Sequence, residues 1–281
     1  MKATMLRATF VTGTCLLSIS LPACREHNRM ISVGHRRLSI DCDGNVGSAK
    51  ATVVLIAGGQ RTAKDWSKVQ PAVSSFVRVC SYDRAGLGKS EKAGSEVQSV
   101  DEIIDDLHTL LKAAGEKAPF ILVGHSVGGL YTRRFVTRFP DEVAGLVFVD
   151  SSHEEGALRE HELIPKVQTL SRRVAQLGFF VKPGERLDWR TDLPLIVLGR
   201  GKPIPRTTIM TEEQFAAWDR IWRELQQDLA SRSTHGQFRL AEHSGHFIQN
   251  DEPQVVILAI RDVYREFQDE SEKHSSGLGH Q

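Results

Sequence analysis

The feature that most constrains this 281-residue chain is an apolar run that leads straight into a glycine-flanked serine. Residues 120–123 (F-I-L-V) have the pattern of a buried strand, G-H-S-V-G follows at 124–128, and a helix-like stretch occupies 130–139. A strand, a sharp turn that exposes a serine, and a helix together form a nucleophile elbow. Gly124 and Gly128 suit such a turn, because a β-carbon would obstruct the close approach of the backbone. The segment therefore predicts that Ser126 is a nucleophile.

Strand patterns alternate with helical spacing over most of the chain. Strands are expected at 30–33, 36–42, 52–56, 77–82, 120–123, 144–149, 193–198 and 238–242. The helix that begins at Val100 is the best defined, because Ser99 and Glu102 form a capping-box pattern and Gly115 is typical of a helix end. The alternation predicts an α/β fold with one doubly wound, mostly parallel eight-stranded sheet, flanked by helices, whose site lies at the carboxyl edge.

The first 24 residues are expected to form an export signal. Lys2 and Arg7 precede a mildly apolar stretch at 8–21, and small residues follow before Cys24. That stretch is too short, and too rich in Ser and Thr, for a membrane span. The sequence leaves three outcomes open: cleavage as a secretory signal peptide, lipidation of Cys24 as in a bacterial lipoprotein, or an uncleaved amphipathic N-terminus. Export would place the protein in the periplasm, in the envelope or outside the cell. Any attachment to a membrane would be through its N-terminus only.

Export would also allow a disulfide between Cys42 and Cys80, because exported proteins meet oxidising conditions. Cys15 lies inside the signal and Cys24 at its end, so Cys42 and Cys80 are the two cysteines that remain as a pair. Each lies in or at the end of an expected strand, and a bridge is reasonable if the two strands are neighbours. Two buried free thiols are the alternative.

His246 is the best candidate for the base that would activate Ser126. It lies in the segment A-E-H-S-G-H-F at 241–247, after the last expected strand and before the last helix. Loops at strand ends present the chemistry of a parallel sheet, and the chain order serine, acid, histidine suits this architecture. His243 is the nearest rival. His243 and His246 do not form a zinc site, because the glutamate and third ligand of a zinc helix are missing. No metal or cofactor is expected.

From Met30 to Phe267 the chain resembles the α/β-hydrolase superfamily, in particular its esterase, lipase and aminopeptidase-like branch. The resemblance rests on G-H-S-V-G, on G-H-F at 245–247 and on D-R-A-G-L-G-K-S at 83–90, which looks like the D-x-x-G-x-G-x-S loop of that family. The loop is not a Walker A motif, since that motif needs glycine where Asp83 stands. Asp83 and Ser90 are expected to hold the loop by hydrogen bonds.

The resemblance also implies an oxyanion hole made of backbone N–H groups. One donor is expected at Val127, directly after the serine. The second is expected at Gly59, with Gln60 as the alternative, in the turn that follows the strand at 52–56. The family usually has His-Gly at this turn, and this chain does not. An ordinary turn is the other interpretation.

The acid that would orient His246 is the least well defined member of the site. The family most often places an Asp after the penultimate strand, but that strand runs here into G-R-G-K-P at 199–203. Asp150, at the end of the strand at 144–149, occupies the alternative position that some members use. The weaker candidates are Glu154 and Glu155, and then Asp219 and Asp228, which are expected on the outer face of a helix.

The expected organisation is a signal at 1–24, a hydrolase domain at 25–267 and a disordered tail at 268–281. A polar insertion at about 151–190 should form a small lid over the serine. Trp218 and Trp222 lie at helical spacing and are expected in the core.

These features predict a serine hydrolase that cleaves a carboxylic ester by way of an acyl-enzyme. Its partner is a small acyl substrate, because a net charge of +1 gives no reason to expect nucleic acid or an anionic membrane surface. Peptidase, lactonase and C–C hydrolase activities would use the same residues and stay open, as does a non-catalytic binding protein of the envelope. Oligomeric state is not predicted.

Overall fold

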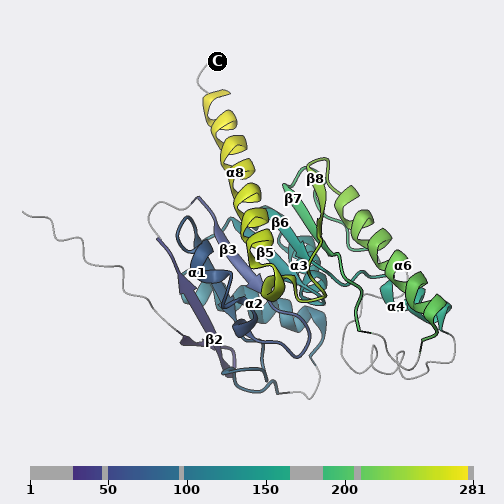
Figure 1. The fold of residues 1–281 in the computed structure, drawn as a ribbon. Coiled ribbons are helices and arrows are strands. Elements are labelled where there is room, and N and C mark those ends of the chain that lie inside the picture. Colours follow the sequence, from purple (N-terminus) through teal and green to yellow (C-terminus); the bar gives the residue numbers. More distant parts are fainter. Residues whose placement is uncertain (1–27, 46–49, 95–97, 165–185, 206–209, 278–281) are drawn as a thin grey trace, which may run out of the picture.

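The computed structural model describes residues 28–45, 50–94, 98–164, 186–205 and 210–277 (Figure 1). The expected export signal, with Cys24, lies outside the described residues. Eight strands form one sheet in the order β1-β2-β4-β3-β5-β6-β7-β8. The strands are β1 (Arg29–Val33), β2 (Arg36–Asp43), β3 (Thr52–Ile56), β4 (Arg78–Tyr82), β5 (Phe120–His125), β6 (Val143–Val149), β7 (Leu195–Arg200) and β8 (Gly236–Ala241).

The sheet is mostly parallel, as predicted. Strands β4, β3, β5, β6, β7 and β8 pair in parallel, whereas β2 pairs antiparallel with β4 and β1 antiparallel with β2. All six parallel strands therefore end at the same edge of the sheet. The loops that follow β3, β5, β6, β7 and β8 meet at that edge and form the candidate site.

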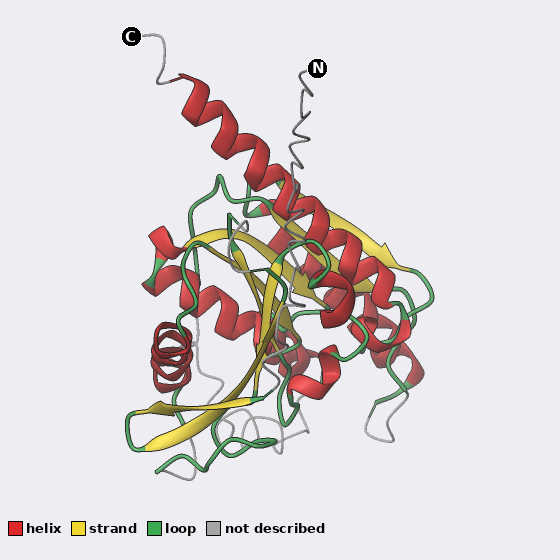
Figure 2. Cartoon of the chain, turned by 90° about the vertical axis from the view of Figure 1, so that its left-hand side faces the viewer, coloured by secondary structure: helices red, strands yellow, loops and turns green. Residues whose placement is uncertain are grey.

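Helices cover both faces of the sheet (Figures 1 and 2). The α-helices are α1 (Gln70–Val73), α2 (Val100–Ala114), α3 (Gly128–Arg138), α4 (Gly156–Leu163), α6 (Glu212–Ser231), α7 (Ile248–Asp251) and α8 (Pro253–Gly277), and the short 3-10 helices are η1 (Ala63–Trp66) and η2 (Pro140–Glu142). Helices α2, α3 and α6 pack on one face, and α1, α7 and α8 on the other. Strand β3 shows why both faces are filled, because alternate residues (Val54 and Ile56, then Val53 and Leu55) enter two separate buried clusters.

Helix α2 begins and ends where the sequence predicts. The Ser99 side chain accepts a hydrogen bond from the Glu102 backbone N–H, the Glu102 side chain accepts one from the Ser99 backbone, and Gly115 has the left-handed φ of 82° that ends many helices. Its apolar face is buried through Ile104, Leu107 and neighbouring residues. On the side of the sheet opposite α8, this face packs against β1, β2 and α3, and α3 covers the middle strands β3, β5 and β6.

Helix α8 extends past Phe267, the predicted end of the hydrolase domain. The tail from Gln268 was expected to be disordered, but the helix continues to Gly277 and projects beyond the rest of the fold (Figures 1 and 2). Its composition explains the difference, since the segment after Phe267 is rich in Glu, Gln and Lys, which favour helices even without a buried face. An ion pair of 2.8 Å between Glu272 and Lys50 also holds the helix to the body.

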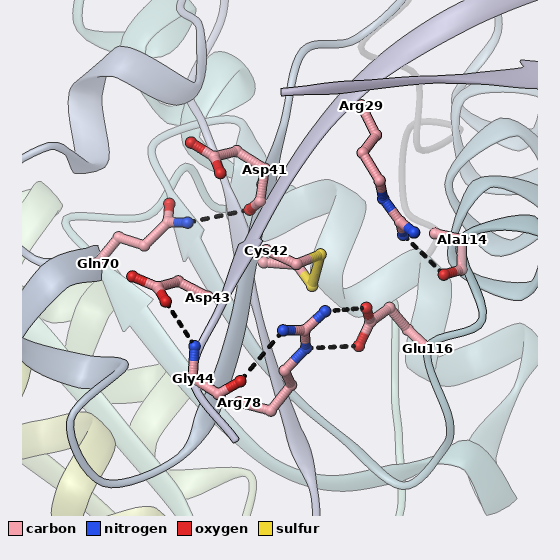
Figure 3. Close-up of a disulfide and its surroundings, with 10 residues drawn as sticks. Arg29, Asp41, Cys42, Asp43, Gly44, Gln70, Arg78, Ala114 and Glu116 are labelled. Atoms are coloured by element: carbon pink, nitrogen blue, oxygen red, sulfur yellow. Dashed lines mark hydrogen bonds and ion pairs between the residues drawn. A yellow bond between two sulfur atoms is a disulfide. The ribbon is translucent and has the colours of Figure 1, made fainter. Parts of the chain in front are cut away.

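The predicted disulfide is present and joins neighbouring strands. Cys42 of β2 and Cys80 of β4 are register partners in an antiparallel pair, with their Cα atoms 4.1 Å apart, and both side chains are buried. Beside them the Arg78 guanidinium donates to both carboxylate oxygens of Glu116, at 2.7 and 3.2 Å, and to the Gly44 carbonyl (Figure 3). The bridge therefore fastens the antiparallel edge to the parallel core. Within the described residues, no helix combines the length and apolar character that crossing a membrane requires.

Candidate active site

Ser126 occupies a sharp turn between β5 and α3. Its φ is 53°, in the left-handed region that a non-glycine residue seldom adopts. The Ser126 N–H donates to the Val149 carbonyl at 3.1 Å, and its own carbonyl accepts from the Ser152 N–H at 2.9 Å. Gly128 has to lack a side chain, because a β-carbon there would lie 2.4 Å from the Ile56 carbonyl oxygen. The turn is thus fixed by the strands on either side, and it leaves the Ser126 side chain partly exposed.

Asp150 lies directly beyond the end of β6, one strand away from Ser126. It also has a left-handed backbone, with φ of 41°, and its N–H donates to the Leu198 carbonyl of β7 at 2.7 Å. This conformation turns its side chain, which is fully buried, toward the carboxyl edge of the sheet. Ser126 and Asp150 are therefore both held in strained backbone conformations at adjacent strand ends.

The structure brings Asp150 and His246 together. Asp150 Oδ2 lies 2.6 Å from His246 Nδ1, although the two residues are 96 positions apart in the chain. His246 is carried by the loop between β8 and α7, which is fastened by hydrogen bonds from the Ser244 hydroxyl to Glu252 and from the Gly245 N–H to Asp251. Because Nδ1 faces the carboxylate, Nε2 is the ring nitrogen left for a proton transfer. His243 is exposed.

His125 links the turn that carries Ser126 to the loop that carries His246. The His125 ring, one residue before the serine, lies 4.8 Å from the His246 ring between centroids, and the His246 carbonyl is 2.9 Å from His125 Nε2. Within the described residues no hydrogen bond joins the Ser126 hydroxyl to His246. Such contacts are often long without substrate and shorten when it binds.

Four hydrogen bonds surround the Asp150 carboxylate. Besides His246, the Trp222 indole N–H donates to Oδ1 at 2.7 Å, the Arg200 backbone N–H to Oδ1 at 3.2 Å and the Arg200 guanidinium to Oδ2 at 3.3 Å. Burial by itself raises the pKa of Asp150, but the hydrogen bond to His246 and the charge of Arg200 outweigh it and leave this pKa below its ordinary value. The carboxylate is therefore ionised at neutral pH.

The turn after β3 packs against the serine. Its carbonyls at Ala57 and Gly58 both accept from the Arg84 guanidinium. Gln60 has a φ of 46°. Within the described residues, none of the hydrogen bonds uses the N–H of Gly59, Gln60 or Val127.

The loop at 83–90 has the structural role that the sequence predicts. Asp83 accepts from the backbone N–H groups of Ala63 and Lys89, at 2.8 and 2.9 Å. The Ser90 hydroxyl donates to the Asp83 carbonyl and accepts from the Ser39 N–H. The loop thereby supports η1 and the turn after β3.

Three side chains on the far side of Asp150 were missed or misplaced from the sequence. Trp222 was predicted to be a core residue, but its indole donates to Asp150. Arg200 stands where the family acid was sought, and it contacts the acid instead. Asp219 was expected on the outer face of α6, yet it accepts from the Arg200 guanidinium at 2.7 Å. The arginine at the end of an expected strand was the one available signal.

Glu155 is exposed, and the other two acidic candidates, Glu154 and Asp228, belong to a separate ionic cluster. Glu154 pairs with Arg133 and Arg232, and Asp228 pairs with His153 at 2.9 Å. None of these contacts involves His246. Asp228 was expected on the outer face of a helix; its side chain is 39% exposed and also gives a counter-charge to the buried His153 and Arg232. Of the insertion expected to form a lid at about 151–190, α4 is described, whereas 165–185 lies outside the described residues.

Groups that could ligate a metal gather at two places in the described part of the chain. One comprises Cys42, Cys80 and Glu116, but the two sulfurs are bonded to each other and Glu116 is held by Arg78. The other, on the surface, comprises His235, Glu266 and Glu270, where His235 already pairs with Glu266 at 2.7 Å. Neither is next to Ser126.

Comparison with known proteins bears on the family and the fold. The model of a family described as the alpha/beta hydrolase family matches residues 53–259. An uncharacterized protein of Bacillus subtilis, YqjL, is 29% identical over 238 residues, which cover 78% of this chain and 85% of the relative. Several other curated relatives are matched over about half of their own length or less. One of them, an AB hydrolase superfamily protein of Gibberella zeae, is 31% identical over 173 residues, which cover 60% of this chain and 50% of that protein.

Two solved structures share the fold at low sequence identity. A putative lipase of Acinetobacter baumannii has a TM-score of 0.63 at 18% identity, covering 87% of this chain and 92% of its own. A thermophilic esterase of Thermogutta terrifontis has a TM-score of 0.58 at 18% identity, covering 85% and 98%. The family model spans more than half of the chain and includes the elbow, the Asp150 turn and the His246 loop. The chain therefore belongs to the alpha/beta hydrolase family.

Proposed function

We propose that the protein is a serine hydrolase that cleaves carboxylic esters of modest size through an acyl-enzyme. Family membership supports hydrolase activity, and the choice of a serine mechanism rests on one observation. His246 Nδ1 lies 2.6 Å from the Asp150 carboxylate, beside the strained turn that exposes Ser126. An imidazole oriented in this way is what a serine needs, because a hydroxyl at its ordinary pKa is a poor nucleophile.

The reaction would proceed in two halves. The Ser126 oxygen forms a bond to the ester carbonyl carbon while His246 Nε2 takes the hydroxyl proton. The C–O bond to the alcohol then breaks, and His246 gives its proton to the departing alcohol. Water attacks the acyl-serine by the same route, releases the acid and restores the Ser126 hydroxyl. Asp150 stays ionised throughout and stabilises the imidazolium.

The tetrahedral intermediate carries a negative oxygen, which the Val127 and Gly59 N–H groups would bind. Both are free of other acceptors among the described residues, and the turn that carries Gly59 packs against Ser126. Gln60, the next residue of that turn, is the alternative donor. Removal of one such donor reduces the rate by about 10² to 10³.

The lipase and esterase named above favour an ester as the bond that is cleaved. Peptidase, lactonase and C–C hydrolase activities use the same residues and are outcomes of the test below. The proposed partner is a small acyl substrate. We also propose that the protein is exported, with Cys24 as the lipidation site if its signal is of the lipoprotein type. A disulfide between Cys42 and Cys80 supports export, because oxidising compartments preserve such bonds.

A fluorophosphonate probe and a series of p-nitrophenyl esters from acetate to palmitate test the proposal. The wild-type protein should become covalently labelled and turn over the shorter esters, and Ser126→Ala should lose both properties. Ser75→Ala is the matched control, because Ser75 is exposed on the surface and its hydroxyl binds only the Ala72 carbonyl. Labelling that survives in Ser126→Ala would overturn the assignment. Absence of labelling in a folded wild-type protein would favour a binding protein.

A further inference from the structure

The carboxylate of Asp150 is held by two residues that lie on the side away from Ser126. Arg200, the last residue of β7, donates from its backbone to Oδ1 and from its guanidinium to Oδ2. Trp222, on α6, donates from its indole to Oδ1 at 2.7 Å. Oδ2 is thereby left facing His246 Nδ1. With one oxygen tied to Trp222, the carboxylate cannot rotate without breaking a hydrogen bond.

Arg200 is itself tightly placed. Its side chain is only 4% exposed, its guanidinium lies 4.9 Å from the centre of the Trp222 ring, and it donates to Asp219 at 2.7 Å. Asp219 and Trp222 are three residues apart on α6, so they share one face of that helix. Helix α6 therefore acts on the Asp150 carboxylate in two ways. Trp222 binds it directly, and Asp219 acts indirectly, as the counter-charge of Arg200.

We propose that Arg200 and Trp222 are positioning residues for the Asp150–His246 pair, and that Asp219 sets how much of the Arg200 charge this pair experiences. The inference rests on the proposed serine hydrolase function. Trp222 supplies orientation. Arg200 supplies orientation and also a positive charge that opposes formation of the imidazolium. Asp219 offsets that charge from the other side.

The electrostatic part of this proposal makes predictions of opposite sign. Without the Arg200 charge the Asp150–His246 pair should bind a proton more readily, so activity should be lost at a higher pH on the acid side. Without the Asp219 charge, Arg200 is less well compensated, so activity should be lost at a lower pH. The other titratable group that faces the pair is His125 from β5, which also experiences the charge of Asp65. Both residues are the same in every variant.

The experiment compares Arg200→Met, Asp219→Asn and Trp222→Phe in the full-length protein. The pH dependence of kcat/KM for p-nitrophenyl acetate should shift its acid limb up by about half a pH unit in Arg200→Met and down by a similar amount in Asp219→Asn. Trp222→Phe keeps a ring and removes the N–H, and should lower kcat by about tenfold with little change in KM. The low-field proton NMR signal of His246 Nδ1–H, assigned by its loss in His246→Gln, reports the same titration without turnover.

Lys202→Met and Trp218→Phe are the matched controls. Lys202 is an exposed cation two residues after Arg200, and its side chain has no ion pair within the described residues. Trp218 packs against Trp222 with ring centroids 5.8 Å apart and the rings tilted by 56°, and it donates no hydrogen bond to Asp150. Both controls should keep the wild-type pH profile and kcat.

Shifts in the same direction, or none, in Arg200→Met and Asp219→Asn would overturn the proposal. The serine hydrolase assignment would survive that result as long as Ser126→Ala stays inactive. If Arg200→Met does not fold, Asp219→Asn decides the electrostatic part alone, because Asp219 is partly exposed and easily replaced. If no ester is turned over, the NMR titration gives the same answer.

Discussion

Gly58 lies directly against Ser126: a β-carbon placed on Gly58 would come within 3.2 Å of the Ser126 β-carbon and 3.0 Å of His125 Nδ1. The two residues belong to loops after neighbouring strands, β3 and β5, which pair in parallel up to Gly124. The elbow and the proposed oxyanion turn are thus packed together with no room for an extra methyl group.

Gly58→Ala should therefore reduce kcat while leaving the fold intact. The added methyl group would move the turn away from Ser126 by a few tenths of an ångström, and small displacements of oxyanion donors are costly, here about tenfold or more. Steady-state kinetics on a short p-nitrophenyl ester measure the effect. Gly94→Ala is the control, because a β-carbon on Gly94 meets nothing within 4 Å. Equal kcat values in both variants would show that the turn does not take part.

Asp150→Asn should reduce kcat by about 10⁴ without unfolding the protein. An amide cannot stabilise the imidazolium. Beside His246 Nδ1 it would favour the wrong tautomer of the imidazole or form the wrong hydrogen bond with it. Circular dichroism and kcat, measured together, separate loss of function from loss of fold. Glu155→Gln is the control, since Glu155 is exposed and lies only a few residues further along the chain. Turnover near the wild-type value in Asp150→Asn would move the acid elsewhere.

Replacement of both Cys42 and Cys80 by Ala should lower the free energy of unfolding by about 4 kcal/mol. The bridge closes a loop with a sequence separation of 38, and its loss gives the unfolded chain more freedom. Urea denaturation of the wild-type protein and the double variant measures the difference. Wild-type protein treated with reductant should approach the variant. Two free thiols in unreduced, denatured, mature protein would contradict the prediction.

Local signals predicted the elements that carry the site. The capping box of α2 depends on Ser99 and Glu102, and the elbow depends on Gly124 and Gly128. These residues lie within a few positions of the helix start and of the turn that they determine. Asp150 was expected on the resemblance, because some members of the family carry the acid one strand after the nucleophile, and in a parallel sheet the ends of neighbouring strands share one edge. Its 2.6 Å contact with His246 follows from that topology.

Contacts between distant elements were not predictable in this way. Trp222 and Asp150 are 72 positions apart, and their hydrogen bond depends on how α6 packs on β7. Helical spacing shows that Trp222 faces inward, but not that its N–H meets a carboxylate. The segment after β3 divides into η1 and α1 for a local reason, because Pro71 lies in the first turn of α1 and favours the start of a new helix there.

His125 should make the protein less stable as the pH falls. Burial, reinforced by the neighbouring His246, lowers the pKa of His125 to about 4, whereas an unfolded histidine titrates near 6.5. Between these two values the unfolded chain binds a proton that the folded chain excludes, so the free energy of unfolding must decrease as the pH drops from about 6.5 to about 4. His125→Asn removes this contribution while keeping a side chain that can donate to the His246 carbonyl. Urea denaturation at about pH 7 and about pH 5 should show a smaller loss of stability in His125→Asn than in the wild-type protein. An identical loss in both would mean that His125 is protonated in the fold, and that its burial beside Gly58 is less complete than its 1% exposure indicates.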